Sequence, residues 1–172
     1  YIVDLFADEL TDEECDFEYL ESQFPQQVKL AKIGDTEEMI SSLYETVVGR
    51  SEGRMPSDER IFLMFFGINR ARRLRTGRIY DEDRNGELSA IEMLQKIILN
   101  GPKYGINSIV WGESLKSIEL MLGDRYDSMF DKRIAFGLDE ESMDILVAES
   151  EAKAIHGKTA VYMDIARDVK NT

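Results

Sequence analysis

Cysteine, histidine and proline are scarce in this sequence, which contains one, one and three of them respectively. Because Cys15 is the only cysteine, no disulfide can form within the chain, and we expect a reducing, cytoplasmic compartment. His156, the only histidine, is remote from Cys15 in the sequence, which argues against a thiol–histidine nucleophile. No run of about 18 apolar residues and no signal peptide occurs, so no membrane segment is predicted.

Basic residues are also in deficit: 21 lysines and arginines face 34 aspartates and glutamates, which gives a formal net charge of −13. Such a surface, taken as a whole, does not suit nucleic acid or anionic membranes, since phosphate binding needs clustered cations. The exception is a local group of arginines, namely Arg70, Arg72, Arg73, Arg75 and Arg78. The group is either a solvated segment that offsets nearby acids or a contact for a DNA backbone, and charge alone does not separate the two.

The composition is that of a globular protein, with 43% hydrophobic and 32% charged residues. A length of 172 residues fits a single domain over 1–172 with an ordinary core. The chain opens on the strand-like segment YIVDLF without an initiator methionine, which suggests a piece of a longer polypeptide.

Short apolar runs rich in β-branched and aromatic residues alternate with segments of helical periodicity. The pattern predicts strands at 1–6, 28–33, 61–66, 106–111, 132–138 and 158–164, and helices at 12–24, 36–48, 89–99, 115–122 and 140–147. Thr36 is predicted to cap the second helix and Gly49 to end it. IFLMFF (61–66) is apolar at six consecutive positions, which predicts a strand covered on both faces. We therefore expect an α/β fold with a mostly parallel sheet flanked by helices, and a mobile connection at 70–86.

Two segments, GPKYGINSIVWGES (101–114) and DKRIAFGLDEESMDIL (131–146), resemble the closing strands of the FtsK/SpoIIIE-type P-loop ATPase core. The resemblance implies a RecA-like fold in which 106–111 and 132–136 are neighbouring parallel strands. It covers the part of the core downstream of the phosphate loop, and no G-x-x-x-x-G-K-[ST] segment occurs in the chain. The intact parent would then be a DNA- or protein-translocating motor that uses ATP and Mg²⁺ in a ring of subunits. This chain alone is expected to be inactive.

The resemblance also implies roles for residues at the strand ends. The family's Walker B motif ends in Asp-Glu, whereas IFLMFF runs into Gly67, Ile68 and Asn69, of which Asn69 could hydrogen-bond a water but not act as a base. Glu113 matches the position of a polar sensor that is glutamine in typical members, and Ser114 is its substitute. Arg133 matches an arginine that can act on a neighbouring subunit's nucleotide; its structural alternative is a salt bridge to strand-end acids.

A competing motif occupies 81–92, where DEDRNGELSAIE fits the calcium-loop pattern D-x-[DN]-x-[DN]-G-x₅-E. The metal-site positions in it are Asp81, Asp83, Asn85, Glu87 and Glu92. The expected entering helix is arginine-rich and there is no second loop to pair with, and both features argue against Ca²⁺. Ser89 with Glu92 also forms a capping box by itself, which explains part of the motif without a metal.

Three other functions remain open on the sequence. A degenerate, non-catalytic ATPase-fold module for assembly or regulation is favoured by the missing Walker B carboxylates and the acidic surface. A calcium-binding α/β domain would use the 81–92 loop. A receiver-like domain with Asp4 after the first strand is the most distant, because no matching Lys–Thr set follows the later strands.

Overall fold

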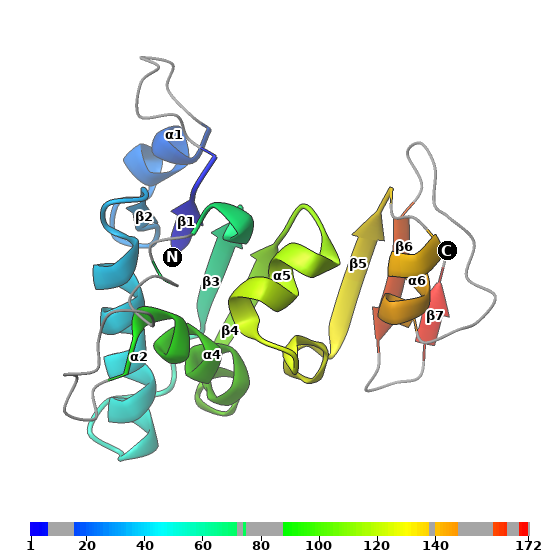
Figure 1. The fold of residues 1–172 in the computed structure, drawn as a ribbon. Coiled ribbons are helices and arrows are strands. Elements are labelled where there is room, and N and C mark those ends of the chain that lie inside the picture. The colour runs from blue at the N-terminus through cyan, green and yellow to red at the C-terminus, as the bar shows by residue number, and fades with distance from the viewer. Residues whose placement is uncertain are drawn as a thin grey trace. The chain divides into compact units, whose positions relative to one another are not determined.

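The computed structural model describes residues 1–6, 16–71, 74, 88–137, 140–147, 160–164 and 169–171 (Figure 1). Where the sequence predicts one domain, these residues divide into two compact units, Tyr1–Glu113 and Ser114–Thr172. Each unit is therefore described by itself. None of the helices in the described residues is long and apolar enough to cross a membrane.

The first unit is built on a four-stranded parallel sheet with the strand order β2-β1-β3-β4. This confirms the α/β fold and the parallel, helix-flanked sheet. The strands are β1 (Ile2–Asp4), β2 (Leu30–Ala31), β3 (Ile61–Phe66) and β4 (Ile106–Trp111), and the helices are α1 (Asp16–Gln23), α2 (Thr36–Ser51), α4 (Ala90–Asn100) and the 3₁₀ turns η1 (Ile68–Arg70) and η2 (Gly101–Tyr104).

The two faces of this sheet are covered to different extents. The chain crosses the sheet in one direction from β1 to β2, and in the opposite direction from β2 to β3 and from β3 to β4. Because such crossovers are right-handed, α1 lies on one face of the sheet and α2 and α4 lie on the other. The face under α2 and α4 is buried, with Val3, Leu63 and Phe65 fully enclosed. Strand register assigns the following residues to the opposite face, which we call the open face: Phe62, Met64, Phe66, Ile109 and Trp111.

The open face corrects the prediction that 61–66 is covered on both sides. Phe62 is 50% exposed, and Met64 and Phe66 are half-buried, so burial alternates along the strand. An apolar run predicts burial from the chemistry of the strand itself, but coverage depends on whether a helix lies over each face. Here α1 reaches one end of the open face, where Phe17 stacks on Phe66 with ring centroids 5.0 Å apart.

Helix α2 differs at both ends from the prediction. Asp35 occupies the cap position, and Thr36 is the first helical residue, with its hydroxyl donating to the Lys32 carbonyl at 2.8 Å. Gly49 does not stop the helix. It lies inside the last turns, where a β-carbon would come within 2.9 Å of the Met55 side chain, so a larger residue would require that exposed side chain to move.

The second unit contains an antiparallel sheet in the order β5-β6-β7. Its elements are α5 (Leu115–Leu122), η3 (Tyr126–Met129), β5 (Lys132–Phe136), α6 (Glu140–Val147), β6 (Ala160–Asp164) and β7 (Val169–Asn171). The expectation that 106–111 and 132–136 are neighbouring parallel strands is therefore wrong: β4 belongs to the first sheet, and β5 pairs with β6 in antiparallel register. The core of this unit is a small apolar cluster made of Leu115, Ala135, Leu146, Val161 and Met163.

Candidate functional site at the carboxyl edge of the parallel sheet

The carboxyl ends of β1, β3 and β4 lie at one edge of the first sheet, the edge at which α/β proteins bind ligands. Asp4, Phe66 and Trp111 stand side by side in register there. The segments that follow carry polar groups, so Asn69 and Glu113, both predicted from sequence as site residues, extend from this same edge. The structure thus brings these two to one region of the first unit.

Asn69 is positioned by a sharp turn after β3. Gly67 adopts a left-handed backbone with φ of 79°, which favours glycine, and a β-carbon there would lie 3.0 Å from the Phe6 ring, so the ring would have to shift for any other residue. The chain then forms η1, in which Asn69 is half-buried. Its side-chain oxygen Oδ1 is buried and has no protein hydrogen-bond partner among the described residues. An amide oxygen of this kind can accept a hydrogen bond from water or a ligand.

Glu113 and Ser114 follow β4, and both are exposed. Ser114 begins the second unit as the N-cap of α5, where its Oγ accepts from the Ser117 backbone N–H at 3.2 Å and its N–H donates to the Ser117 hydroxyl. The prediction of Ser114 as a nucleotide-binding residue stays a prediction, and its hydroxyl already has a structural role.

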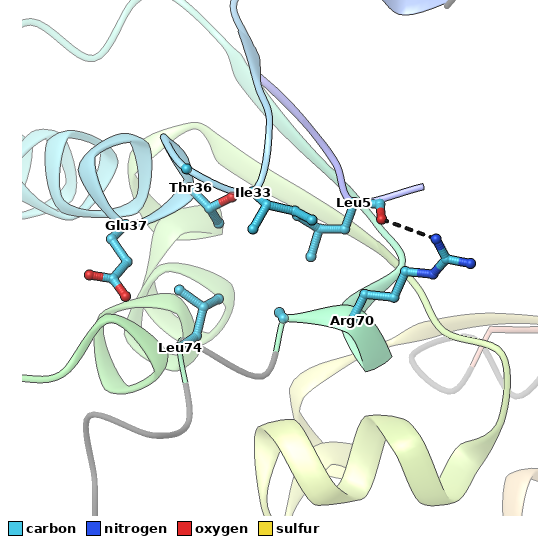
Figure 2. Close-up of a pocket in the computed structure, with 8 residues that line it drawn as sticks. Leu5, Ile33, Thr36, Glu37, Arg70 and Leu74 are labelled. Atoms are coloured by element: carbon cyan, nitrogen blue, oxygen red, sulfur yellow. Dashed lines mark hydrogen bonds between the residues drawn. The ribbon is translucent and has the colours of Figure 1, made fainter. Parts of the chain in front are cut away.

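A small pocket lies beside this edge, between the ends of β1 and β2, the start of α2 and the segment after β3 (Figure 2). Its volume is about 150 Å³. Arg70 and Glu37 lie on opposite sides of it, and apolar side chains of Leu5, Ile33 and Leu74 line the space between. Pockets that enclose a whole organic ligand span roughly 300–1,000 Å³, so this one is too small for a nucleotide.

Arg70 is the one predicted cluster arginine that the structure describes. Its Nη1 donates to the Leu5 carbonyl at 3.5 Å, and its guanidinium lies 4.5 Å from the centroid of the Phe6 ring. These contacts hold the side chain against the end of β1. The other four arginines, together with most of the 70–86 connection, lie outside the described residues.

Arg133 lies in the second unit, on β5. Its Nη1 donates to the Leu146 carbonyl at 2.9 Å and its Nη2 to the Asp127 carbonyl, so one guanidinium joins the end of α6 to η3. The partners are backbone carbonyls rather than the strand-end acids considered from sequence. Arg133 therefore has a structural function within its own unit, and the role toward a neighbouring subunit's nucleotide stays a prediction.

The predicted calcium loop falls mostly outside the described residues, which exclude Asp81, Asp83, Asn85 and Glu87. Glu92 is described, and its Oε2 accepts from the Ser89 backbone N–H at 2.9 Å and from the Ser89 hydroxyl at 2.7 Å. The capping box predicted at the start of α4 is thus confirmed. Within the described part of the chain, no cluster of three or more His, Cys, Asp or Glu side chains could hold a metal.

Taken together, the described residues at this edge offer hydrogen-bond acceptors and one arginine. The turn after β3 holds an amide where the resemblance calls for carboxylates, and the chain has no phosphate loop. Glu113 adds an exposed carboxylate to the same edge.

Searches of protein-family models, of curated proteins and of solved structures found no match to this chain.

The sequence singled out Asp4 only for the receiver-like alternative and did not group it with Asn69 and Glu113. Asp4 is 6% exposed, and its Oδ1 accepts from the Phe6 backbone N–H at 2.9 Å. The available signal was a carboxylate at the end of an apolar run, which is the usual place for functional groups on a parallel strand. The strand order, which places β1 beside β3, is needed to show that Asp4 lies next to the end of β3.

Proposed function

We propose that the first unit is the distal part of an FtsK/SpoIIIE-like ATPase core, and that a phosphate-loop segment of the same polypeptide completes its nucleotide cleft. The parent would be a ring-forming motor that moves DNA or protein with ATP and Mg²⁺. The chain in hand would bind nucleotide poorly and hydrolyse none.

One observation carries the proposal: among the strands that the structure describes, β4 is the outermost of the parallel sheet, and the polar segment after it shares an edge with Asn69. Strands of a parallel sheet are normally buried on both faces, and edge strands are usually short. Strand β4 has six residues and its Ile109 is 50% exposed, which is unusual for an edge strand of a parallel sheet. A further strand beside β4 would make it interior and would bring a loop to the edge that holds Glu113.

The test begins with the gene. The codons before Tyr1 should encode G-x-x-x-x-G-K-[ST] after an apolar run, and the longer polypeptide should bind ATP whereas the 172-residue chain should not. The matched control is the longer polypeptide with its loop lysine changed to alanine, which should lose binding. A parent without this loop would remove the motor proposal.

A second candidate function is a non-catalytic ATPase-fold module that serves assembly or regulation. The specific observation in its favour is the turn Gly67–Asn69, which lacks both carboxylates of Walker B. The two candidates separate on the longer polypeptide: ATP turnover, measured with and without double-stranded DNA, supports the motor, and ATP binding without turnover supports the module.

A further inference from the structure

The pocket shown in Figure 2 lies at a topological switch point of the first sheet. Strands β1 and β3 are neighbours, but the connection after β1 leads to α1 on one face and the connection after β3 leads to α4 on the other. Open α/β sheets bind ligands in the crevice that forms where adjacent strands send their connections to opposite faces. Leu5 follows β1, Arg70 and Ala71 follow β3, and all three line the pocket. The pocket therefore occupies the place at which this kind of sheet binds a ligand.

The interior of the pocket is apolar. Leu5, Ala71 and Leu74 line it, and each is at most 5% exposed. The hydroxyl of Thr36 donates to the Lys32 carbonyl at 2.8 Å, so this donor is already used within the protein. An apolar cavity of about 150 Å³, the volume found here, holds one benzene-sized group. The interior thus fits an aliphatic segment of roughly four to six carbons.

Two exposed side chains of opposite charge lie on opposite sides of this interior, Glu37 in the first turn of α2 and Arg70 in η1 (Figure 2). Glu37 has no ion-pair partner within the residues that the structure describes. Among the described hydrogen bonds, Arg70 donates only from Nη1, to the Leu5 carbonyl across 3.5 Å. A guanidinium has several N–H donors and binds a carboxylate through a pair of them. A ligand that matches both side chains carries an ammonium at one end and a carboxylate at the other.

We propose that this pocket binds a small ω-amino carboxylate, a molecule with an ammonium and a carboxylate at the two ends of a short aliphatic chain. Glu37 accepts from the ammonium, Arg70 donates to the carboxylate, and the apolar interior encloses the methylene groups. An α-amino acid carries both charges at one end, so it does not match side chains on opposite sides of the pocket. Binding of this ligand requires neither a phosphate loop nor ATP, so it stands or falls independently of the proposed function.

Ligand-observed NMR titration of the 172-residue chain tests the proposal with δ-aminovalerate and three relatives of the same chain length. Valerate lacks the ammonium, pentylamine lacks the carboxylate, and norvaline is the isomer with both charges at one end. We expect δ-aminovalerate to bind with a Kd of roughly 1 mM or below. Each relative should bind about tenfold more weakly, because each loses a charged hydrogen bond. Equal binding of all four would show a merely apolar slot and overturn the proposal, as would no binding of δ-aminovalerate.

Variants of the two charged side chains test their assigned partners. Glu37→Gln should weaken δ-aminovalerate about tenfold and leave valerate unchanged, because valerate has no ammonium. Arg70→Met should weaken δ-aminovalerate about tenfold and leave pentylamine unchanged, because pentylamine has no carboxylate. Glu38→Gln is the matched control, since Glu38 is the other carboxylate in the first turn of α2 and does not line the pocket.

Affinity for δ-aminovalerate should be the same in Glu38→Gln as in the wild type. An undiminished affinity in Glu37→Gln, or an equal loss in Glu38→Gln, would overturn the proposal. Because Glu37 is exposed, its substitution keeps the fold, and this comparison decides the question even if Arg70→Met fails to fold.

Discussion

Arg50 is the clearest case of a single side chain that organises the first unit. It is 8% exposed at the end of α2, and its Nη1 donates to the carbonyls of Glu59 at 2.9 Å and Tyr104 at 2.8 Å. These carbonyls precede β3 and β4, so one guanidinium joins a helix end to the amino edge of two strands. A cation there also suits the helix dipole.

Replacement of Arg50 by methionine keeps the aliphatic stem and removes both hydrogen bonds. Two carbonyls in a partly buried setting then lose their donor, and we expect the free energy of unfolding to fall by about 2–4 kcal/mol. Urea denaturation followed by the fluorescence of Trp111, the only tryptophan, measures this directly. Arg54→Met is the matched control, because its ion pair with Glu52 is exposed and should contribute less than about 1 kcal/mol. Equal losses in both variants would contradict the assigned role.

At the scale of the element, the start of α4 allows two roles of Glu92 to be distinguished, that of a helix cap and that of a metal ligand. The capping box uses the Glu92 carboxylate as an acceptor for Ser89. Glutamine can take this place in a capping box, whereas it cannot serve as the bidentate carboxylate of a calcium loop. The two roles therefore respond differently to one conservative substitution.

We expect Glu92→Gln to cost less than about 0.5 kcal/mol and Glu92→Ala about 1 kcal/mol, because only alanine removes the acceptor. Millimolar Ca²⁺ should not change the unfolding midpoint of the wild type. Calorimetric titration of the wild type with Ca²⁺ should show no heat of binding. A calcium-dependent rise in wild-type stability that Glu92→Gln abolishes would instead establish the 81–92 loop as a metal site.

Local patterns account for the elements that the sequence predicts correctly. Strand β3 and the Ser89–Glu92 cap follow from neighbouring residues alone, and both are confirmed. The exposure of Phe62 could not be predicted, because it depends on which helix crosses that face. The antiparallel pairing of β5 depends on a strand that begins 24 residues after it ends. For the same reason, the sequence placed Asn69 and Glu113 at strand ends but suggested strand-end acids as partners of the Arg133 guanidinium, which instead donates to the Leu146 and Asp127 carbonyls.

At the scale of the whole molecule, the two units have separate cores and we expect them to respond separately to pH. Tyr126 packs against the apolar cluster of the second unit. Burial raises its pKa above the ordinary value of 10.0, and Glu119 raises it further. The folded state thus holds the phenol proton more tightly than the unfolded state. This contribution to stability is complete below pH 10 and is lost as the pH rises through the folded pKa.

Tyr126→Phe removes the titrating group and leaves most of the packing. Hydrogen exchange at 132–136 and 160–164 should therefore be equal in the two proteins near pH 7, and faster in the wild type than in the variant at about pH 10.5, where only the wild type can ionise. Unfolding of the first unit, followed by Trp111 fluorescence, should be the same in both proteins at either pH, because Trp111 lies in the other unit. A shift of the Trp111 transition on substitution would show that the two cores unfold as one. Equal exchange rates at high pH would show that the phenol ionises without cost to the folded second unit.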